Sequence, residues 1–505
     1  MSTIDSFEIE NKGAQATRWS MLTEVVAKLV APITNMLLAR LLSPEAFGVV
    51  ATVTMIVSFA EIFSDAGFQK YLIQHDYSSR DELYENANVA FWTNILIALF
   101  LWLMIAIFSE QLAFAVGSPG LGIVVIVASA SLPLTAFVGV QMALFKRDFD
   151  FKNLFIVRLL LLIVPLVVTV PLAFLTHSYW ALVTGTLLTN LLNACLLAYK
   201  SNWKPKLSFS FAVLHNMFSY SWWILLESVA VWLTTYVDTF IVGFCLDSYY
   251  LGIYKTSMVT VAAIMNVIVS AISAPMFSTL SRLKNDNFLL INTYLKFIRA
   301  LASFLIPLGA CIWLYRELVT NILLGNQWGD AVDFVGLWGL VGSFCITLGT
   351  FCNGLYNAKG LTKLSFVSQV LHLVVLIPAI FIAAQISYEV LYVTRSFVRL
   401  ELVLAQLVLM WIYFRIPPLD SFKNVSAATA CTLFASLGCL VVQWFLPYQW
   451  EPIIGIPVFA VSYLLLMHFL SRGTLERSCE VLGFPLRKLT GRIGLIKEKQ
   501  EDNCQ

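Results

Sequence analysis

Long apolar runs separated by short polar segments make up almost the whole chain. Fourteen windows are predominantly apolar, and a bilayer core about 30 Å thick needs roughly 20 apolar residues for each helix that crosses it. Each window therefore predicts a transmembrane helix, and we expect an all-α polytopic membrane protein. The predicted spans cover residues 17–42, 46–64, 89–108, 121–145, 154–174, 179–199, 216–243, 249–281, 294–315, 332–355, 364–384, 390–414, 427–446 and 452–470.

The composition excludes a water-soluble globular protein. Of the 505 residues, 59% are hydrophobic and 12% are charged, whereas a soluble domain carries about 25% charged residues. The net charge of +2 lacks the strong basic excess of nucleic-acid-binding proteins, so no nucleic-acid partner is expected. The nine cysteines include no Cys-x-x-Cys pair and lie mostly in apolar runs. They are typical of small core residues, and neither a disulfide framework nor a zinc site is expected.

Basic residues are unevenly divided between the two sets of connecting segments. Segments after even-numbered spans hold 14 Lys and Arg residues, whereas segments after odd-numbered spans hold only Arg40 and Arg316. Cytoplasmic loops carry the excess of Lys and Arg in membrane proteins. The asymmetry therefore predicts that the even-numbered loops and both termini are cytoplasmic.

The first half of the chain resembles the second at an offset of 203 residues. Trp19, Glu24 and Ala27 correspond to Trp222, Glu227 and Ala230, Asn35 corresponds to Asp238, and Phe47-Gly48 corresponds to Leu251-Gly252 after a slip of one residue. This offset equals the spacing between spans 1 and 7, which predicts two pseudosymmetric six-helix lobes with two helices appended. Such halves around a midplane cavity are a common transporter plan. The predicted parts are a cytoplasmic N-terminal segment (1–16), an N-lobe (17–199), a cytoplasmic linker (200–215), a C-lobe (216–414), spans 13 and 14 (427–470) and a basic cytoplasmic tail (471–505).

Several charged residues lie inside predicted spans, where a charge at the bilayer centre costs about 2.5–3.5 kcal/mol and favours a cavity or a charged partner. Glu24 and Lys28 are four residues apart on one helical face, a spacing that suits an ion pair. We expect basic residues to hold an anionic substrate and acids to bind a coupling ion; the alternatives are structural ion pairs and side chains that reach the membrane interface. The candidate substrate-binding residues are Lys28, Arg158, Lys255, Arg395 and Arg399, and the candidate ion-coupling residues are Glu24, Glu227 and Asp238.

Sequence signatures of bond-making chemistry are missing. The chain has no phosphate-binding Gly-x-x-x-x-Gly-Lys-[Ser/Thr] loop, no His-Glu-x-x-His and no Gly-x-Ser-x-Gly. Its five histidines are far apart and mostly near the ends of predicted spans, so no metal site is expected. We predict no catalytic residue and no cofactor, and therefore a transporter rather than an enzyme.

Several phrases of the sequence match one family in order and spacing over about residues 10–415. The chain resembles the Wzx-type polysaccharide flippases, in the branch of the colanic-acid exporter, within the superfamily that also holds MATE multidrug antiporters and lipid II flippases. The phrases are Gly13-Ala14, Trp19-Ser20, Leu38-Ala39-Arg40-Leu41-Leu42, Phe47-Gly48, Phe63-Ser64-Asp65-Ala66-Gly67, Leu72-Ile73-Gln74, Phe145-Lys146-Arg147-Asp148-Phe149-Asp150-Phe151, Asp238-Thr239, Gly243, Leu251-Gly252-Ile253-Tyr254, Pro275-Met276-Phe277-Ser278, Leu323-Leu324-Gly325-Asn326-Gln327-Trp328 and Ala358-Lys359-Gly360-Leu361-Thr362-Lys363.

The resemblance implies a fourteen-helix protein of the bacterial inner membrane. Its implied cargo is an oligosaccharide repeat unit on undecaprenyl pyrophosphate, destined for O-antigen, capsule or exopolysaccharide. It further implies a coupling ion, H⁺ or Na⁺, and polysaccharide polymerase and chain-length proteins as partners. Two other classes stay open. A MATE-like ion-coupled antiporter would use the acids, and a membrane glycan polymerase or acyltransferase would carry a large periplasmic loop.

Overall fold

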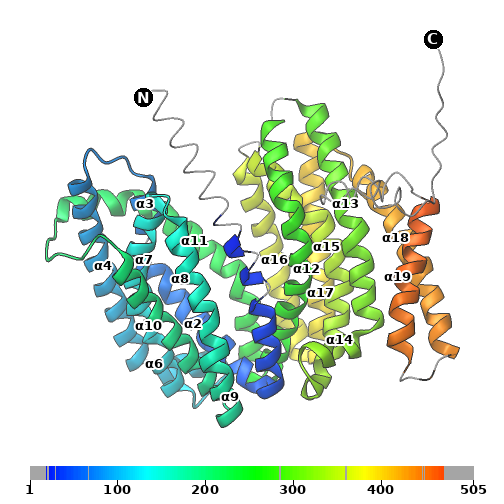
Figure 1. The fold of residues 1–505 in the computed structure, drawn as a ribbon, viewed down its shortest axis with the longest axis horizontal. Helices are drawn as coiled ribbons and strands as arrows, with labels where there is room; N and C mark the ends of the chain where they lie inside the picture. The colour runs from blue at the N-terminus through cyan, green and yellow to red at the C-terminus, as the bar shows by residue number, and fades with distance from the viewer. Residues whose placement is uncertain are drawn as a thin grey trace. The chain divides into compact units, whose positions relative to one another are not determined.

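The computed structural model describes residues 19, 22–24, 26–28, 30–65, 67–283, 286–358, 361–445, 447 and 450–470, apart from some side chains inside helices, among them that of Glu227. The predicted terminal segments 1–16 and 471–505 lie outside the described residues. Every element of regular structure in the described part is a helix (Figure 1).

Fourteen of the described helical segments are long and apolar enough to cross a membrane, which confirms the predicted number of spans and the all-α polytopic class. The first runs over Leu22–Leu41. The others are built from α2 (Pro44–Asp65), α4 (Arg80–Ile107), α6 (Gly122–Ser129), α7 (Ser131–Arg147), α8 (Phe151–Val164), η1 (Pro165–Thr169), α9 (Val170–Thr176), α10 (Trp180–Lys200), α11 (Phe211–Cys245), α12 (Ser248–Arg282), α13 (Asn287–Leu314), η2 (Asn326–Ala331), α15 (Val332–Ala358), α16 (Thr362–Ile386), α17 (Tyr388–Phe414), α18 (Pro418–Phe445) and α19 (Glu451–Leu470). Short helices α3 (Phe68–Gln74), α5 (Ser109–Ala115) and α14 (Arg316–Leu323) connect them.

Two of these spans depart from regular α-helix, each close to a proline. The fourth span breaks at Ala130, between α6 and α7, because Pro133 has no N–H to donate to the carbonyl of Ser129 one turn earlier. The fifth span widens into the π-helical turn η1, which begins at Pro165. Turns of this kind are frequent at functional sites.

The chain forms two compact units. The first contains the chain up to Thr256 together with Leu323–Trp328 and Ile380–Tyr388, and the second contains the remainder. The division into lobes 17–199 and 216–414 stays a prediction. In the first unit α2 packs against α4, α7 and α11, and α7 packs against α4 and α10. Its core contains closely packed Val53, Val57, Val125 and Leu132.

Repeat-related glycines meet inside the first unit. A Cβ on Gly48 at the beginning of α2 would lie 1.7 Å from the carbonyl oxygen of Ser248, and a Cβ on Gly252 of α12 would lie 1.8 Å from that of Pro44. The two backbones therefore touch where a side chain would prevent contact. The Ser118 hydroxyl lies 3.0 Å from the Ser248 hydroxyl beside this crossing.

The second unit is organised around α13, which packs against both α15 and α18. The Tyr463 hydroxyl of α19 donates to the Ser303 carbonyl of α13 at 2.7 Å. The Arg299 guanidinium of α13 donates through Nε to the side-chain oxygen of Asn424 at 3.0 Å. Polar contacts of this kind attach the appended helices α18 and α19 to the unit.

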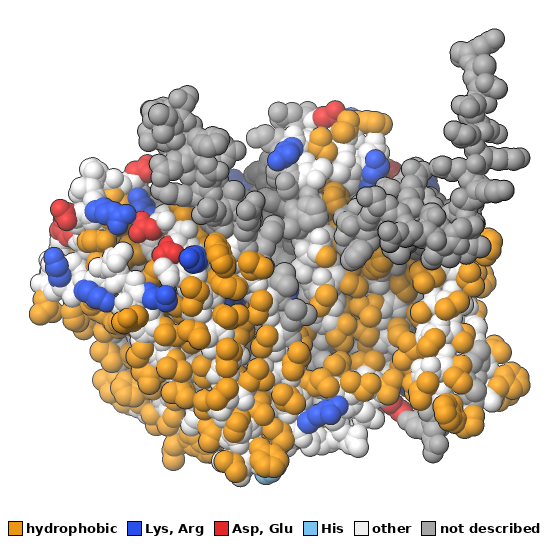
Figure 2. All heavy atoms as spheres, viewed as in Figure 1, with side chains coloured by type: hydrophobic (Ala, Val, Ile, Leu, Met, Phe, Trp, Pro, Cys, Tyr) orange, Lys and Arg blue, Asp and Glu red, His pale blue; other side chains and the backbone are white. Residues whose placement is uncertain are grey.

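The surface of the first unit has the polarity that a membrane requires. Figure 2 shows apolar side chains over the middle of its helices and basic and acidic side chains gathered at the end where α3 lies. Lys146, Lys152 and Arg80 are exposed, and an ion pair joins Arg80 to Asp148 at 3.7 Å. Charged residues gathered at one end of apolar helices are typical of a membrane–water interface.

Candidate functional site

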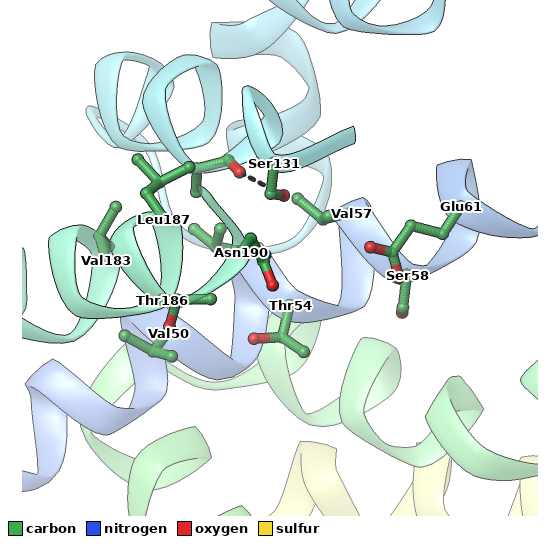
Figure 3. A pocket seen from close by; sticks show the side chains of 12 residues that line it. Val50, Thr54, Val57, Ser58, Glu61, Ser131, Val183, Thr186, Leu187 and Asn190 are labelled. Atoms are coloured by element: carbon green, nitrogen blue, oxygen red, sulfur yellow. Dashed lines mark hydrogen bonds between the residues drawn. The ribbon is translucent and has the colours of Figure 1, made fainter. Parts of the chain in front are cut away.

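A groove lined by both polar and apolar residues runs along α2 within the first unit. It encloses a cavity of about 140 Å³ between α2, α10 and the junction of α6 with α7. Figure 3 shows Thr54, Asn190 and Ser131 around its middle and Glu61 at one end. The six polar residues that line it are Thr54, Ser58, Glu61, Ser131, Thr186 and Asn190.

Helical spacing explains why these residues share the groove. Thr54, Ser58 and Glu61 stand at positions i, i+4 and i+7 of α2, and Thr186 and Asn190 stand four apart on α10. Residues at these spacings lie on one face of a helix. The break in the fourth span supplies the third side, where the Ser131 hydroxyl donates to the Ala128 carbonyl at 2.8 Å. Discontinuous membrane helices line binding sites in many transporters.

One hydroxyl of the groove is hydrogen-bonded to α11. Ser58 accepts a hydrogen bond from the Trp232 indole N–H at 3.0 Å and donates to the Met55 carbonyl at 3.0 Å. The Phe59 and Trp232 rings are 4.7 Å apart between centroids. A ligand that reaches Ser58 would therefore contact a hydroxyl that is already hydrogen-bonded to Trp232 of α11.

Two predicted site residues of the first unit form an ion pair. The Glu24 carboxylate lies 3.4 Å from the Arg158 guanidinium, and about half of each side chain is exposed. This contact joins the first helix to α8. Lys28 lies half-buried one turn further along the first helix. The observed pair is thus one that four-residue spacing did not predict.

Asp238 and Lys255 also come together, at the α11–α12 hairpin. The Asp238 carboxylate is buried and accepts hydrogen bonds from the Tyr254 hydroxyl at 2.9 Å and from the Thr239 N–H at 2.7 Å. The Lys255 ammonium donates to the Thr239 hydroxyl at 3.1 Å and lies 5.0 Å from the Tyr236 ring centroid. The side chain of Glu227 lies outside the described residues.

The remaining predicted cations share one tryptophan in the second unit. Arg395 and Arg399 of α17 place their guanidinium carbons 5.2 Å and 4.3 Å from the Trp338 ring centroid. Cation–π contacts of this kind contribute about 0.5–2 kcal/mol each. Glu401 lies on the same helix as the two arginines, and its carboxylate is 3.1 Å from the His372 ring of α16.

Sequence reasoning missed three of these features. The row on α2 was detectable, because three polar residues recur on one face of an apolar helix. Trp338 gave no signal, since its partners lie about sixty residues away. His372 lies ten residues inside α16, away from the span ends near which most of the histidines stand. Within the described residues no three His, Cys, Asp or Glu side chains converge as metal ligands.

These features define a polytopic helical membrane protein, and its fold is similar to those of two solved structures. The lipid II flippase MurJ in an inward closed conformation is similar at a TM-score of 0.72 with 14% identity, covering 91% of this chain and 100% of that one. An inward-facing multidrug resistance MATE family transporter of the MOP superfamily is similar at a TM-score of 0.60 with 14% identity, covering 78% and 95%.

The chain belongs to the family of polysaccharide biosynthesis proteins, whose model matches residues 37–333. Succinoglycan biosynthesis transport protein ExoT of Rhizobium meliloti (strain 1021) is 23% identical over 471 residues, covering 91% of this chain and 93% of that protein. Lipopolysaccharide biosynthesis protein WzxC of Escherichia coli (strain K12) is 20% identical over 445 residues, covering 87% and 88%. The resemblance that the sequence phrases indicated is confirmed.

Proposed function

We propose that this protein is a flippase for undecaprenyl-pyrophosphate-linked oligosaccharide repeat units. It would move them by alternating access from the cytoplasmic to the periplasmic leaflet, for export of an O-antigen, a capsule or an exopolysaccharide. The observation that carries this proposal is the match to the polysaccharide biosynthesis family over residues 37–333, in a chain with fourteen helices able to span a membrane. The relatives named for polysaccharide biosynthesis or its transport support it over most of the chain.

The chemistry of such a cargo suits the predicted cations. A pyrophosphate is anionic, and Lys and Arg side chains are its usual protein partners. Lys28, Arg158, Lys255, Arg395 and Arg399 would hold it, and Glu24, Glu227 or Asp238 would bind the coupling ion, H⁺ or Na⁺. No bond of the cargo is made or broken, so the protein acts as a transporter and not as an enzyme. A polymerase and chain-length proteins would receive the flipped product.

The location and orientation follow from the same proposal. The protein would lie in the inner membrane of a bacterium with both termini in the cytoplasm. The excess of Lys and Arg in the segments after even-numbered spans supports this orientation.

Sidedness of the lipid-linked oligosaccharide tests the proposal. Spheroplasts that lack the ligase and the polymerase accumulate flipped material, which a membrane-impermeant glycan-labelling reagent detects. We expect labelling only when this protein is present. Equal labelling with and without it, in a strain without another flippase, would contradict the proposal. A gain of drug resistance on overexpression would then favour the MATE-like antiporter.

A further inference from the structure

The polar groups of the α2 groove form a row rather than a cluster. Thr54 and Glu61 are seven residues apart on α2, about 10 Å along the axis at 1.5 Å per residue. Thr186 and Asn190 add a second row about 6 Å long on α10. Five of the six polar side chains are neutral hydroxyls or an amide, and only Glu61 has an ionisable side chain.

This arrangement does not suit a single metal cation. Oxygen ligands of a bound cation lie about 2.3–2.6 Å from it, so they lie within roughly 5 Å of one another. The end residues of a row about 10 Å long are too far apart to share one cation. The cavity of about 140 Å³ is many times the ~10–15 Å³ that one water molecule needs, so it offers the space of a ligand with many atoms rather than of one ion.

The groove provides the hydrogen-bond partners and the apolar wall that a sugar requires. Each hydroxyl that enters an apolar environment without a partner costs about 1–3 kcal/mol in proteins, so a glycan that crosses a membrane requires replacement hydrogen-bond partners. Thr54 and Thr186 are exposed; the Thr186 hydroxyl, which donates to the Leu182 carbonyl, can accept from a sugar hydroxyl, and the Asn190 amide both donates and accepts. The carboxylate of Glu61 adds strong acceptors. Between the polar residues, Val57 and Leu187 provide apolar wall for the C–H faces of a ring.

We propose that the groove formed by α2, α10 and the α6–α7 break is a glycan subsite, an inference that rests on the proposed function. It binds a sugar of the repeat unit beyond the one attached to the pyrophosphate, while cations elsewhere hold the anionic group. The ligand class is a neutral or weakly charged hexose-sized sugar. Ser58 links occupancy to α11, because the Trp232 indole already occupies that hydroxyl.

The chain offers a matched control for this proposal on a single helix. Thr186 lines the groove and donates to the Leu182 carbonyl at 2.9 Å. Thr184, two residues earlier, is also exposed and donates to the Trp180 carbonyl at 2.6 Å, but it is not among the groove-lining residues. Thr→Val keeps the shape of either side chain and removes its hydroxyl.

A transport experiment with two cargoes distinguishes recognition of the outer sugars from recognition of the lipid pyrophosphate carrier. One strain makes the complete repeat unit on undecaprenyl pyrophosphate, and a second, lacking the later glycosyltransferases, makes only the single-sugar lipid. For Thr54→Val with Thr186→Val we expect at least a tenfold fall in flipping of the complete unit and little change for the single-sugar lipid. Thr184→Val should behave like wild type. An equal fall for both cargoes, or no fall for either, would overturn the proposal.

A binding measurement tests the glycan subsite without a transport assay. Saturation-transfer NMR on the purified full chain in nanodiscs, with free oligosaccharide released from the carrier, should show contact with the sugars beyond the first. The signals should disappear in Thr54→Val with Thr186→Val and persist in Thr184→Val. Absence of signal with the wild-type chain would refute the subsite. If binding is seen but wild type flips neither cargo, the proposed function fails while the subsite stands.

A further variant, Glu61→Gln, would reveal a coupling-ion site if the groove is one. In that case Glu61→Gln would abolish the dependence of transport on Na⁺ or pH for both cargoes. The glycan subsite predicts instead that Glu61→Gln keeps the dependence on Na⁺ or pH, because the coupling ion binds elsewhere. The variant should weaken only transport of the complete unit, since the amide still bonds to sugar hydroxyls.

Discussion

Arg158 carries a charge on a helix that is otherwise almost wholly apolar, and its partner lies on the first helix. The ion pair with Glu24 at 3.4 Å leaves about half of the guanidinium exposed, so it retains donors for another anion. Lys28 lies one turn from Glu24 on the same helix. An anionic pyrophosphate that approaches this pair would compete with a single carboxylate, which is a weaker partner than two phosphate groups.

We therefore expect Lys28→Ala with Arg158→Ala to stop export without lowering the amount of protein. The loss should be at least tenfold in the spheroplast labelling rate, equivalent to about 1.4 kcal/mol or more. The exchange Glu24→Arg with Arg158→Glu is the control, because it keeps an ion pair between the helices. Full export in the double alanine variant would show that these cations do not hold the cargo.

Arg147 belongs to one of the sequence segments that resemble the flippase family, and its side chain stabilises the fold. Its guanidinium donates to the carbonyls of Leu72, Ile73 and His75 at 2.9, 3.0 and 2.7 Å, at the C-terminal end of α3. These carbonyls have no further partner within the helix. The guanidinium also lies 4.6 Å from the Tyr77 ring centroid.

Arg147→Met should lower stability by about 1.5–3 kcal/mol, the range for hydrogen bonds to a charged group. Thermal unfolding of the purified protein would then occur a few degrees lower than in wild type. Lys146→Met is the matched control, since Lys146 is the adjacent exposed residue and its loss should leave the unfolding temperature within a degree. Equal shifts in both variants would mean that charge, and not the three hydrogen bonds, is what matters.

Among the elements, the crossing of α2 and α12 depends on two glycines that the internal repeat places in equivalent positions. Gly48 and Gly252 each touch the backbone of the other helix, because a Cβ at either would meet a carbonyl oxygen at less than 2 Å. Since backbone atoms cannot move aside as a flexible side chain can, alanine at either position must separate the helices.

We expect Gly48→Ala or Gly252→Ala to destabilise the described conformation by about 1–3 kcal/mol, the usual cost of overpacking. A cross-link between Ser118→Cys and Ser248→Cys, whose hydroxyls lie 3.0 Å apart, should form in the parent and fall severalfold in either glycine variant. Gly438→Ala is the control, because a Cβ there has nothing within 4 Å. Undiminished cross-linking in the glycine variants would contradict the close crossing.

The elements themselves were largely predictable, whereas their contacts were not. Apolar runs identify fourteen spans because the bilayer sets their length, and Pro133 and Pro165 lie at the two irregular helices. The partners of Glu24 and Ser58 lie 134 and 174 residues away, and periodicity along one helix says nothing about such distances. The repeat paired Gly48 with Gly252 as equivalents, but only the folded chain shows that they touch.

For the molecule as a whole, the distribution of basic residues predicts the orientation in the membrane, which no single helix indicates by itself. Segments after even-numbered spans hold 14 Lys and Arg residues and those after odd-numbered spans hold two. This excess predicts which ends of the fourteen helices face the cytoplasm. It also decides whether the cations near those ends face the leaflet in which a lipid-linked precursor is made.

Fusions of a reporter to the loops test this orientation. Alkaline phosphatase, which is active only outside the cytoplasm, should be active after Leu246 and inactive after Lys204, and a fluorescent protein fused at the C-terminus should fluoresce. Replacing Lys200, Lys204 and Lys206 together with Asn removes three charges from one even-numbered segment and should leave the orientation intact, because eleven basic residues remain in those segments. Activity of the phosphatase after Lys204 would reverse the orientation. The fold and the family would be unaffected by that outcome.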